Sequence, residues 1–341
     1  MKVLVTGGAG FIGSTIASAC ADEGMDVVVL DDLSTGLASF GRRHAFYEGD
    51  YGDAGLVARV FADHPDIEAV VHCAASIVVP DSMADPVAYY ANNVAKVPGF
   101  LRALLGTRCR RFLFSSSASM YDTPVAGDLV VDEDAPLRPL SPYAATKQMV
   151  ARMLADLARA SDFRAIALRY FNPIGADPQL RTGLQLAHPS HALGRLVEAR
   201  ALGTPFTVTG ADWATRDGSG LRDYIHVWDL ARAHVAALQR MDDVLAGATM
   251  GERFDAINLG TGLGTTVFEL VTAFGQATGQ PMPYAVGPRR PGDVIGCCAS
   301  GAKAARVLGW RAELGIEQGI LDALAWSAKL PGVLAAEARV E

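Results

Sequence analysis

The 341-residue sequence has no long apolar run, no long basic run and few cysteines, and each absence narrows its function. No hydrophobic stretch approaches the ~18 residues that a membrane helix needs. No charged segment followed by an apolar one opens the chain, so secretion is not indicated either. The formal net charge is -7, which argues against nucleic acid as a standing partner. We therefore expect a cytoplasmic protein that binds neither membranes nor nucleic acid.

Cysteine is scarce, with five residues in the chain. They are an odd and scattered set, and the adjacent pair Cys297 and Cys298 does not have the spacing of metal ligands. We therefore expect reduced thiols and no metal site. Half of the residues are hydrophobic, and the chain is long enough to bury a large core and to divide into two lobes.

A glycine-rich segment near the start of the chain has the spacing of a dinucleotide-binding loop. Residues 2–5 are a strand-like run, residues 6–13 read Thr-Gly-Gly-Ala-Gly-Phe-Ile-Gly, and a helical pattern follows. Gly7 permits the tight turn, Gly10 lets the backbone approach a pyrophosphate, and Gly13 lets the helix pack on the strand. The N-terminus of that helix would offer N–H groups to the phosphates. An ordinary glycine-rich turn is the alternative.

Acidic residues follow the next two predicted strands. A branched run at 27–30 ends at Asp31, about 20 residues after the glycine loop, where a carboxylate can bond both ribose hydroxyls. Asp32 follows without an adjacent arginine. Because two carboxylates repel a 2′-phosphate, NAD is favoured over NADP. A third strand, near 45–47, ends close to Asp50, which is a candidate adenine contact.

Two further strand-like runs end in small residues. These residues are His72, Cys73 and Ala74 after positions 69–71, and Ser115, Ser116 and Ser117 after positions 111–114. Ligands of open parallel sheets bind beyond the carboxyl ends of the strands, so we expect these residues to lie near the ligand.

Tyr143 and Lys147 form the most informative pair in the sequence. Their i, i+4 spacing places both side chains on one face of a helix. A lysine ammonium beside a phenol favours the phenolate, so we expect the pKa of Tyr143 to fall toward neutrality. Taken alone, the pattern is also compatible with a solvated helix face.

In these motifs the chain resembles the extended short-chain dehydrogenase/reductase superfamily, and more closely the UDP-glucose 4-epimerases. The dehydrogenase motifs specify the superfamily only, whereas two Arg-Asp segments and Arg-Tyr-Phe-Asn-Pro narrow the resemblance to the epimerases. The matching segments follow the family's order along nearly the whole chain, at positions 6–13, 72–75, 89–93, 115–117, 143–147, 169–173, 222–227, 289–293 and 308–310.

The resemblance implies an α/β fold, a Rossmann-type doubly wound parallel sheet with a smaller C-terminal α/β substrate domain. Residues 1–173, with about 222–260 returning to them, would form the NAD-binding domain. Residues 174–221 and 261–341 would bind the nucleotide sugar.

It also implies a homodimer, because the family often dimerises through helices that correspond here to positions near 88–105 and 143–160. The second of these helices begins with Tyr143, so assembly and catalysis would share an element.

Bound NAD is implied as well, with a set of contacts to it. Asp31 and Asp32 would hold the adenosine ribose, Lys147 would hold the nicotinamide ribose, and Asn92 would support the cofactor and its helix. The implied NAD contacts are Gly7, Gly10, Phe11, Ile12, Gly13, Asp31, Asp32, Asp50, Tyr51, Cys73, Ala74, Asn92, Ser115, Tyr143, Lys147 and Phe171.

Catalysis is implied for Ser117, Tyr143 and Lys147. Tyr143, as phenolate, would take the proton of the sugar's 4-hydroxyl, and Ser117 would hydrogen-bond the 4-oxygen and pass its proton. Hydride transfer to NAD and back, through a 4-keto sugar that presents its other face, would invert carbon 4 without net oxidation.

Substrate contacts are implied in the second half of the chain. Arg222 and Arg290 would clamp the two phosphates, which suits planar guanidinium groups. Asp293 would bind a uridine ribose hydroxyl, and His191, or Ser190 after a one-residue shift, would contact the diphosphate. The other implied contacts are Asn172 at the diphosphate, Ser117 at the sugar, Thr207, Val208 and Thr209 beside uracil, and Cys297 at the hexose.

Two positions depart from the family pattern. Cys297 stands where many epimerases have a tyrosine, and a small residue there admits a 2-acetamido group, so we expect UDP-GlcNAc and UDP-GalNAc to be substrates too. The alternative is that Cys297 is merely a small core residue. Thr209 stands where an aromatic residue often flanks uracil, which leaves a UDP-pentose, UDP-uronate or TDP-hexose substrate open.

Two other functions were weighed. A nucleotide-sugar 4,6-dehydratase needs an Asp-Glu pair just after the serines, where this chain has Ala118 and Ser119. A non-catalytic NAD-binding regulator is disfavoured because the serine, tyrosine and lysine of catalysis are all present.

Overall fold

A seven-stranded parallel sheet forms the centre of the computed structural model, which describes residues 1–122, 129–186, 188–248, 250, 253–289 and 293–339. Its strand order is β11-β7-β5-β4-β1-β2-β3. The strands are β1 (Lys2–Thr6), β2 (Asp26–Asp31), β3 (Ala45–Glu48), β4 (Ile67–His72), β5 (Arg111–Ser117), β7 (Arg164–Tyr170) and β11 (Phe254–Leu259). Each is paired in parallel with its neighbours.

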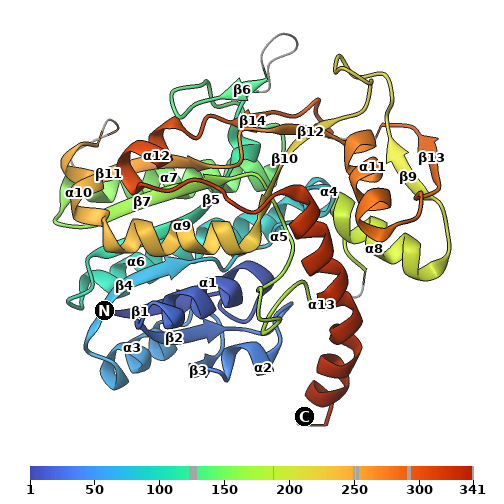
Figure 1. Ribbon diagram of the computed structural model, residues 1–341. Helices are drawn as coiled ribbons and strands as arrows, with labels where there is room; N and C mark the ends of the chain where they lie inside the picture. The colour runs from blue at the N-terminus through green and yellow to red at the C-terminus, as the bar shows by residue number, and fades with distance from the viewer. Residues whose placement is uncertain (123–128, 187, 249, 251–252, 290–292, 340–341) are drawn as a thin grey trace.

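Helices cover both faces of this sheet (Figure 1). One face packs against α1 (Phe11–Asp22), α9 (Val227–Gln239), α10 (Met241–Ala246) and α12 (Ala302–Leu308). The other face packs against α3 (Ala54–Asp63), α6 (Val97–Leu105) and α7 (Pro142–Ala160). Because both faces are shielded, the strands are continuous apolar runs rather than alternating ones, and β2 is buried from its second residue onward. The Rossmann-type doubly wound α/β fold predicted from the sequence is confirmed.

Smaller sheets lie at the carboxyl side of the central sheet. A three-stranded sheet has the order β12-β10-β8, and β9 pairs with β13 in parallel. Their core is shared with helices α8 (Ala192–Leu202), α11 (Val267–Thr278) and α13 (Ile316–Glu337). The strands are β8 (Asn172–Ile174), β9 (Phe206–Thr209), β10 (Leu221–His226), β12 (Gly264–Thr266) and β13 (Tyr284–Gly287), while β6 (Val130–Val131) pairs with β14 (Cys298–Ala299).

The segment expected to return to the first lobe divides between the two parts. Strand β11 forms the edge of the central sheet, and α9 packs against α1. Strand β10 instead pairs with β8, because β8 leaves the central sheet directly after β7 and offers β10 a parallel partner. The proposed domain boundaries remain a prediction.

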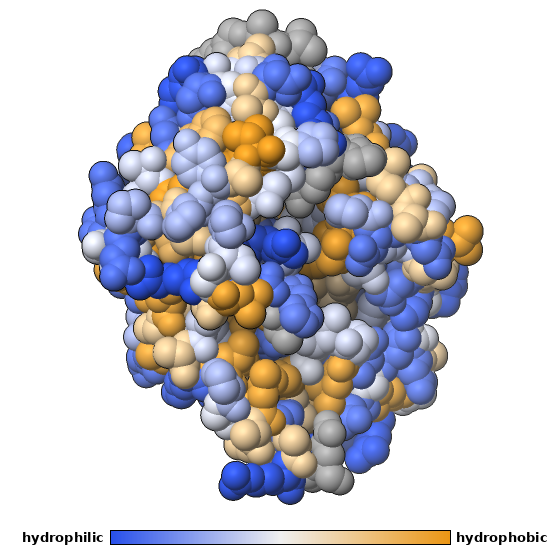
Figure 2. Space-filling model, turned by 90° about the vertical axis from the view of Figure 1, so that its right-hand side faces the viewer, coloured by the Kyte–Doolittle hydropathy of each residue, from blue (hydrophilic) through white to orange (hydrophobic). Residues whose placement is uncertain are grey.

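Short helices follow three strands of the central sheet, β2, β4 and β5. They are α2 (Ala38–Gly41), α4 (Val79–Ala84), α5 (Pro86–Tyr90), the π-helix η1 (Ala91–Ala95) and the 3₁₀ turn η2 (Ala118–Met120). Among the residues that the structure describes, none of the helices combines the length and apolar character that a membrane span requires. Figure 2, which views the molecule from the right-hand side of Figure 1, shows apolar side chains scattered among polar ones.

Candidate active site

The glycine loop after β1 has the conformation that a dinucleotide site needs. Gly7 has φ +72°, and a Cβ there would lie 2.6 Å from the backbone nitrogen of Ala74. A Cβ on Gly13 would overlap the carbonyl oxygen of Gly7. At Gly10 a Cβ would meet only the Gly7 oxygen, at 3.5 Å, so protein packing leaves this side of the loop open to a ligand. Gly10 is the N-cap of α1 and carries no capping side chain, so this helix end suits a phosphate.

Asp31 ties the end of β2 to the glycine loop. Its Oδ2 accepts the Ala9 N–H at 2.9 Å, and its Oδ1 accepts the Leu33 N–H at 2.8 Å. Burial raises the pKa of this carboxyl, and the hydrogen bond from Ala9 acts in the opposite direction. Each carboxylate oxygen still has a lone pair for a ribose hydroxyl. Asp32 is exposed and accepts the backbone N–H and the hydroxyl of Ser34.

A lysine that we did not predict links three of the expected NAD contacts. The Lys96 ammonium lies 2.6 Å from Asp50 Oδ2 and 2.7 Å from Asn92 Oδ1. The Tyr51 hydroxyl donates to the Asn92 carbonyl at 2.6 Å. Burial alone would raise the pKa of Asp50, but the hydrogen bond from Lys96 lowers it below its usual value. The i, i+4 spacing of Asn92 and Lys96 was a signal for this contact.

Asn92 lies in the π-helix η1, between α5 and α6. Single π turns inside longer helices are rare and occur mostly at functional sites. The Asn92 amide donates to the Ser76 hydroxyl at 3.0 Å, so it also fastens the segment that follows β4.

The start of α7 places Tyr143 and Lys147 against the end of β5. Ser141 caps the helix by accepting the Ala144 N–H at 3.2 Å. Both Tyr143 and Lys147 are buried, and the Lys147 ammonium lies 5.9 Å from the centre of the Tyr143 ring. That ammonium donates to the carbonyl of Ser115 at 2.8 Å. The structure therefore brings the tyrosine, the lysine and the serine run together.

The electrostatics of this pair differ from the sequence-based expectation. Burial raises the pKa of Tyr143 to about 12, and the hydroxyl of Ser117 acts in the opposite direction. Burial also lowers the pKa of Lys147 to about 8. The prediction that Lys147 lowers the pKa of Tyr143 is wrong for the protein alone. Desolvation of the phenol is the largest cause of the shift, and the Lys147 ammonium is bonded to a backbone carbonyl rather than to the phenol.

On the substrate side, Arg222 and Asp293 lie together although 71 residues separate them. An Arg222 N–H group donates to Asp293 Oδ1 at 3.3 Å, and a second donates to the Leu221 carbonyl at 2.7 Å. Arg290, the predicted partner of Arg222, lies outside the described residues. Its neighbour Arg289 is bonded to Asp212 and stacks on an indole ring, with its guanidinium carbon 3.7 Å from the ring centre.

Cys297 and Phe171 meet in a small apolar cluster at the ends of β5 and β7. Both are half-buried and pack against a core formed by Ala118, Tyr121 and Val131. Burial raises the pKa of the Cys297 thiol to about 12, which disfavours the reactive thiolate form. The predicted specificity residue is thus next to the turn that follows Ser117.

The remaining predicted contacts differ in exposure. His191 caps α8 by accepting the Gly194 N–H at Nδ1, and its buried Nε2 has no hydrogen-bond partner among the described residues. Burial lowers the pKa of His191 to about 4, whereas Ser190 is exposed. Asn172 begins β8 opposite Tyr224. On β9, Thr207 is exposed and Thr209 half-buried, while Val208 points into the core, so only the backbone of Val208 can face a ligand.

Asp223 is a second residue that we did not predict. Its buried carboxylate accepts four hydrogen bonds: the N–H and hydroxyl of Thr261, at 2.8 and 2.6 Å, and the N–H groups of Gly262 and Ala299, both at 3.0 Å. It therefore fixes β14, which directly follows Cys297, to the strand that carries Arg222. The only signal in the sequence was its position beside Arg222.

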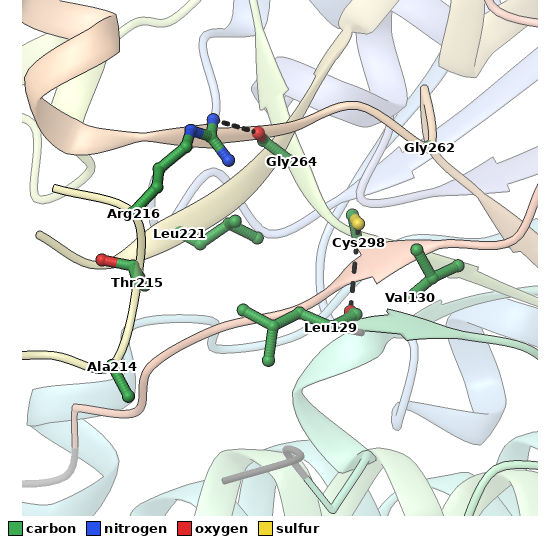
Figure 3. Close-up of a pocket in the computed structure, with 9 residues that line it drawn as sticks. All are labelled: Leu129, Val130, Ala214, Thr215, Arg216, Leu221, Gly262, Gly264 and Cys298. Carbon is green, nitrogen blue, oxygen red and sulfur yellow. Dashed lines mark hydrogen bonds between the residues drawn. The ribbon is translucent and has the colours of Figure 1, made fainter. Parts of the chain in front are cut away.

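A surface hollow of about 340 Å³ is lined in part by Leu221, Gly262 and Cys298, which neighbour Arg222, Asp223 and Cys297 (Figure 3). Across it, the Arg216 guanidinium donates to the Gly264 carbonyl at 2.7 Å, and Cys298 donates to the Leu129 carbonyl at 3.9 Å. None of the predicted site residues lines it. Within the described ranges, no three His, Cys, Asp or Glu side chains lie together as metal ligands.

Comparison with known proteins identifies the class. The model of the NAD dependent epimerase/dehydratase family matches residues 3–259, and the chain belongs to this family. The resemblance to UDP-glucose 4-epimerases is also confirmed. The UDP-glucose 4-epimerase of Bacillus subtilis is 40% identical over 349 residues, which cover 99% of this chain and 100% of that protein.

Solved structures agree. The UDP-glucose 4-epimerase of Bifidobacterium longum in complex with NAD⁺ and UDP superposes with a TM-score of 0.88 at 36% identity, covering 97% of this chain and 99% of that one. The UDP-Glc/GlcNAc 4-epimerase of Campylobacter jejuni gives a TM-score of 0.78 at 32% identity, covering 96% and 99%.

Proposed function

We propose that the protein is an NAD-dependent 4-epimerase of UDP-hexoses that interconverts UDP-glucose and UDP-galactose through a 4-keto sugar. The observation that carries this proposal is the meeting of Ser117, Tyr143 and Lys147 at the carboxyl end of the sheet. A glycine loop and a buried carboxylate lie at neighbouring strand ends. The relatives named above are 4-epimerases of the same substrate class.

The residues of the site fit NAD. The open side of Gly10 and the uncapped start of α1 suit a pyrophosphate, and Asp31 suits ribose hydroxyls. Asp32 lies beside Asp31, where a 2′-phosphate would be repelled. When bound there, NAD⁺ would accept a hydride from carbon 4 of the sugar and return it to the opposite face.

Tyr143 is the proposed acid/base. Without cofactor or substrate, burial raises the pKa of Tyr143 to about 12, so its phenol is protonated near neutrality. A positive charge nearby lowers a phenol's pKa, and both Lys147 and bound NAD⁺ would contribute such charge. Ser117 already acts on the phenol in that direction, and its hydroxyl would bond the sugar's 4-oxygen.

Arg222 is the proposed anchor of the diphosphate. Backbone carbonyls of Leu221, Val294 and Ile295 hold one of its terminal nitrogens, which fixes the plane of the guanidinium. The 3.3 Å bond from its other nitrogen to Asp293 is long enough to be exchanged for a phosphate oxygen. A firm grip on the nucleotide leaves the hexose free to turn, as inversion at carbon 4 requires.

The small side chain of Cys297 supports acceptance of 2-acetamido sugars. It packs beside Phe171 and Ala118 without filling the volume of a phenol. The Campylobacter jejuni relative, named for both UDP-Glc and UDP-GlcNAc, has the same fold. UDP-pentose, UDP-uronate and TDP-hexose are alternative substrates, since the half-buried Thr209 of β9 stands where an aromatic residue often flanks uracil in the family.

A homodimer in the cytoplasm completes the proposal. The absence of disulfides among the five cysteines, all of which the structure describes, supports a reducing compartment. Exposed apolar side chains on adjoining helices α4, α5 and α7 support a subunit interface, and they include Met83, Val87 and Met149.

The test is an assay of the purified protein without added cofactor. We expect the protein to contain NAD and to convert UDP-galactose into UDP-glucose. The conversion is monitored by NMR of the anomeric protons. Failure to epimerise either sugar, even with NAD supplied, would contradict the proposal. Parallel assays with N-acetylated, pentose and TDP sugars rank the alternatives.

Tyr143→Phe tests the acid/base assignment. Removing the hydroxyl should lower kcat by ~10²–10⁴-fold, which is the contribution of general acid/base catalysis. Tyr47→Phe is a matched control, because the Tyr47 hydroxyl donates to Asp63 at the exposed surface. Near-normal turnover by Tyr143→Phe, with NAD still bound, would rule out the assignment.

A further inference from the structure

The far end of α13 contacts the segment that follows Asp31. Both carboxylate oxygens of Glu337 accept the N–H of Ser39, at 3.0 and 3.1 Å, across 298 residues of sequence. Figure 1 shows α13 descending along the molecule until its last turns lie beside α2, which contains Ser39. Helix α13 thus contacts the side of the central sheet where we propose that NAD binds.

An apolar cluster supports this contact. Phe40 of α2 packs against Trp326 of α13 with ring centres 5.7 Å apart, and Ala176 completes the buried core of the cluster. Leu37, Leu180, Leu330 and Val333 pack around it. Because Trp326 and Phe40 are both buried, α2 cannot move from α13 without exposing a large apolar area.

Two short steps connect α2 with the proposed NAD contacts. The Leu37 N–H donates to the Ala9 carbonyl at 3.1 Å, and the Ala9 N–H donates to Asp31 Oδ2 at 2.9 Å. Gly36 lies so close to the glycine loop that a Cβ on it would be 2.8 Å from the Cβ of Ala9. The position of residues 33–39 is therefore coupled directly to the glycine loop and to the ribose carboxylate.

Gln185 makes a second tie to the same segment. Its amide nitrogen donates to the Thr35 carbonyl at 2.7 Å, and its side chain is buried. The indole N–H of Trp326 donates to the carbonyl of Leu184, the residue before Gln185, at 2.8 Å. Helix α13 and the 184–185 segment therefore hold residues 33–39 from two sides.

Two residues near the contact between α2 and α13 have a strained backbone, and hydrogen bonds to their neighbours explain why the strain persists. Leu33 (φ +57°) and Leu180 (φ +53°) are the two non-glycine residues with positive φ in the part of the chain that the structure describes. Leu33 is held by Asp31 and Leu180 by a hydrogen bond from Lys329 of α13. Such conformations persist only where the surroundings fix them, and they cluster at ligand-binding segments.

We propose that Glu337 and Gln185 are positioning residues of the NAD site. They hold residues 33–39 against the glycine loop, so that Asp31 is placed for the adenosine ribose before the cofactor arrives. Cofactor release then requires this segment to swing away, against the ties to α13 and to Gln185. The proposal rests on the NAD binding of the proposed function and adds a control on cofactor retention by the C-terminal helix.

The experiment measures exchange of bound NAD in the purified holoprotein. Protein is incubated with isotopically labelled NAD, passed through gel filtration, and its bound NAD is quantified by mass spectrometry over time. We expect Glu337→Ala to exchange NAD about tenfold faster than the wild type, and Gln185→Ala to behave similarly. Glu337→Gln keeps an acceptor oxygen without the charge, so it should fall between Glu337→Ala and the wild type.

Glu317→Ala is the matched control. Glu317 is an exposed acid in the first turn of the same helix, so its loss weakens α13 without touching the contact with α2. We expect wild-type NAD exchange in this variant and an unchanged dissociation constant for UDP in all four variants. Hydrogen exchange should lose protection in peptides spanning 33–41 for Glu337→Ala and Gln185→Ala, and should keep it for Glu317→Ala.

The outcomes separate the two proposals. If the wild type holds NAD but Glu337→Ala and Gln185→Ala exchange it at the wild-type rate, the positioning role is overturned and the proposed function stands. If these variants lose UDP affinity in parallel with NAD, the residues serve general stability and the positioning role is again overturned. A wild type that binds no NAD overturns both proposals.

Discussion

At the scale of single residues, we expect the size of the Cys297 side chain to limit the width of the proposed sugar pocket. Cys297 packs among Ala118, Tyr121 and Phe171, next to the turn that follows Ser117. Burial raises the pKa of its thiol to about 12, which favours the thiol over the reactive thiolate. A larger side chain in this place would compete with a substituent on carbon 2 of the sugar.

Cys297→Tyr should therefore abolish the use of N-acetylated sugars and spare UDP-glucose. We expect kcat/KM for UDP-GlcNAc to fall by roughly 5- to 150-fold, because overpacking typically costs about 1–3 kcal/mol. Cys297→Ser keeps the small volume and should retain both activities. Loss of both activities in the tyrosine variant, or of neither, would contradict a gating role.

Single residues were also where the sequence was most and least informative. Asp31, Tyr143 and the glycines could be predicted because their roles depend on local geometry: a strand end, one helix face, a positive φ. Asp223 and the bond between Lys96 and Asp50 could not, since both depend on partners that only folding brings close. The pKa of Tyr143 was mispredicted for the same reason, because burial is a property of the tertiary structure.

At the scale of elements, the junction between β10 and β14 links the two sides of the proposed substrate site. Asp223, on β10, accepts the Ala299 N–H of β14 and the Gly262 N–H of the loop after β11. Arg222 stands beside it on β10, and Cys297 lies just before β14. One buried carboxylate thus links the strand of the proposed phosphate anchor to the strand next to the proposed specificity residue.

Asp223→Asn should weaken this junction. The new amide group places a donor against one or more of the N–H groups, and leaving a buried donor unsatisfied costs about 1–3 kcal/mol. We expect the free energy of unfolding in urea to fall by that amount, and the KM for UDP-glucose to rise. Asp212→Asn, which breaks an exposed ion pair with Arg289, should change stability by less than about 1 kcal/mol. Equal effects of the two substitutions would exclude the special role of Asp223.

At the scale of the whole molecule, the central sheet could be predicted from the sequence, and the placement of later segments only in part. Buried apolar runs such as those of β1, β2 and β4 mark parallel strands by composition alone. Strand β10, which carries Arg222 and Asp223, lies in the segment expected to return to the first lobe, yet it pairs with β8 outside the central sheet. Pairing between strands distant in the sequence depends on which edges are free, and no local pattern encodes that.

Subunit association is the prediction that belongs to this scale. Val87 is 75% exposed and Met149 44% exposed on adjoining helices of one surface. We expect light scattering to give twice the chain mass of 35.9 kDa. The double substitution Val87→Glu with Met149→Glu should give a monomer that still contains NAD, whereas Leu202→Glu, on α8, should leave the mass unchanged. A wild-type monomer at micromolar concentration would contradict the homodimer.

The hydrogen bond between Glu337 and Ser39 has a consequence for folding during synthesis on the ribosome. A ribosome makes the chain from its N-terminus, so the strands and the glycine loop of the cofactor half emerge first. Ser39 must wait for 298 further residues before its partner is synthesised. Until then the N-terminal part of the nascent chain can form strands of the central sheet, but residues 33–39 lack their contact with Glu337. If Glu337 positions the NAD site as proposed, full retention of the cofactor requires that α13 has been synthesised and has docked on α2.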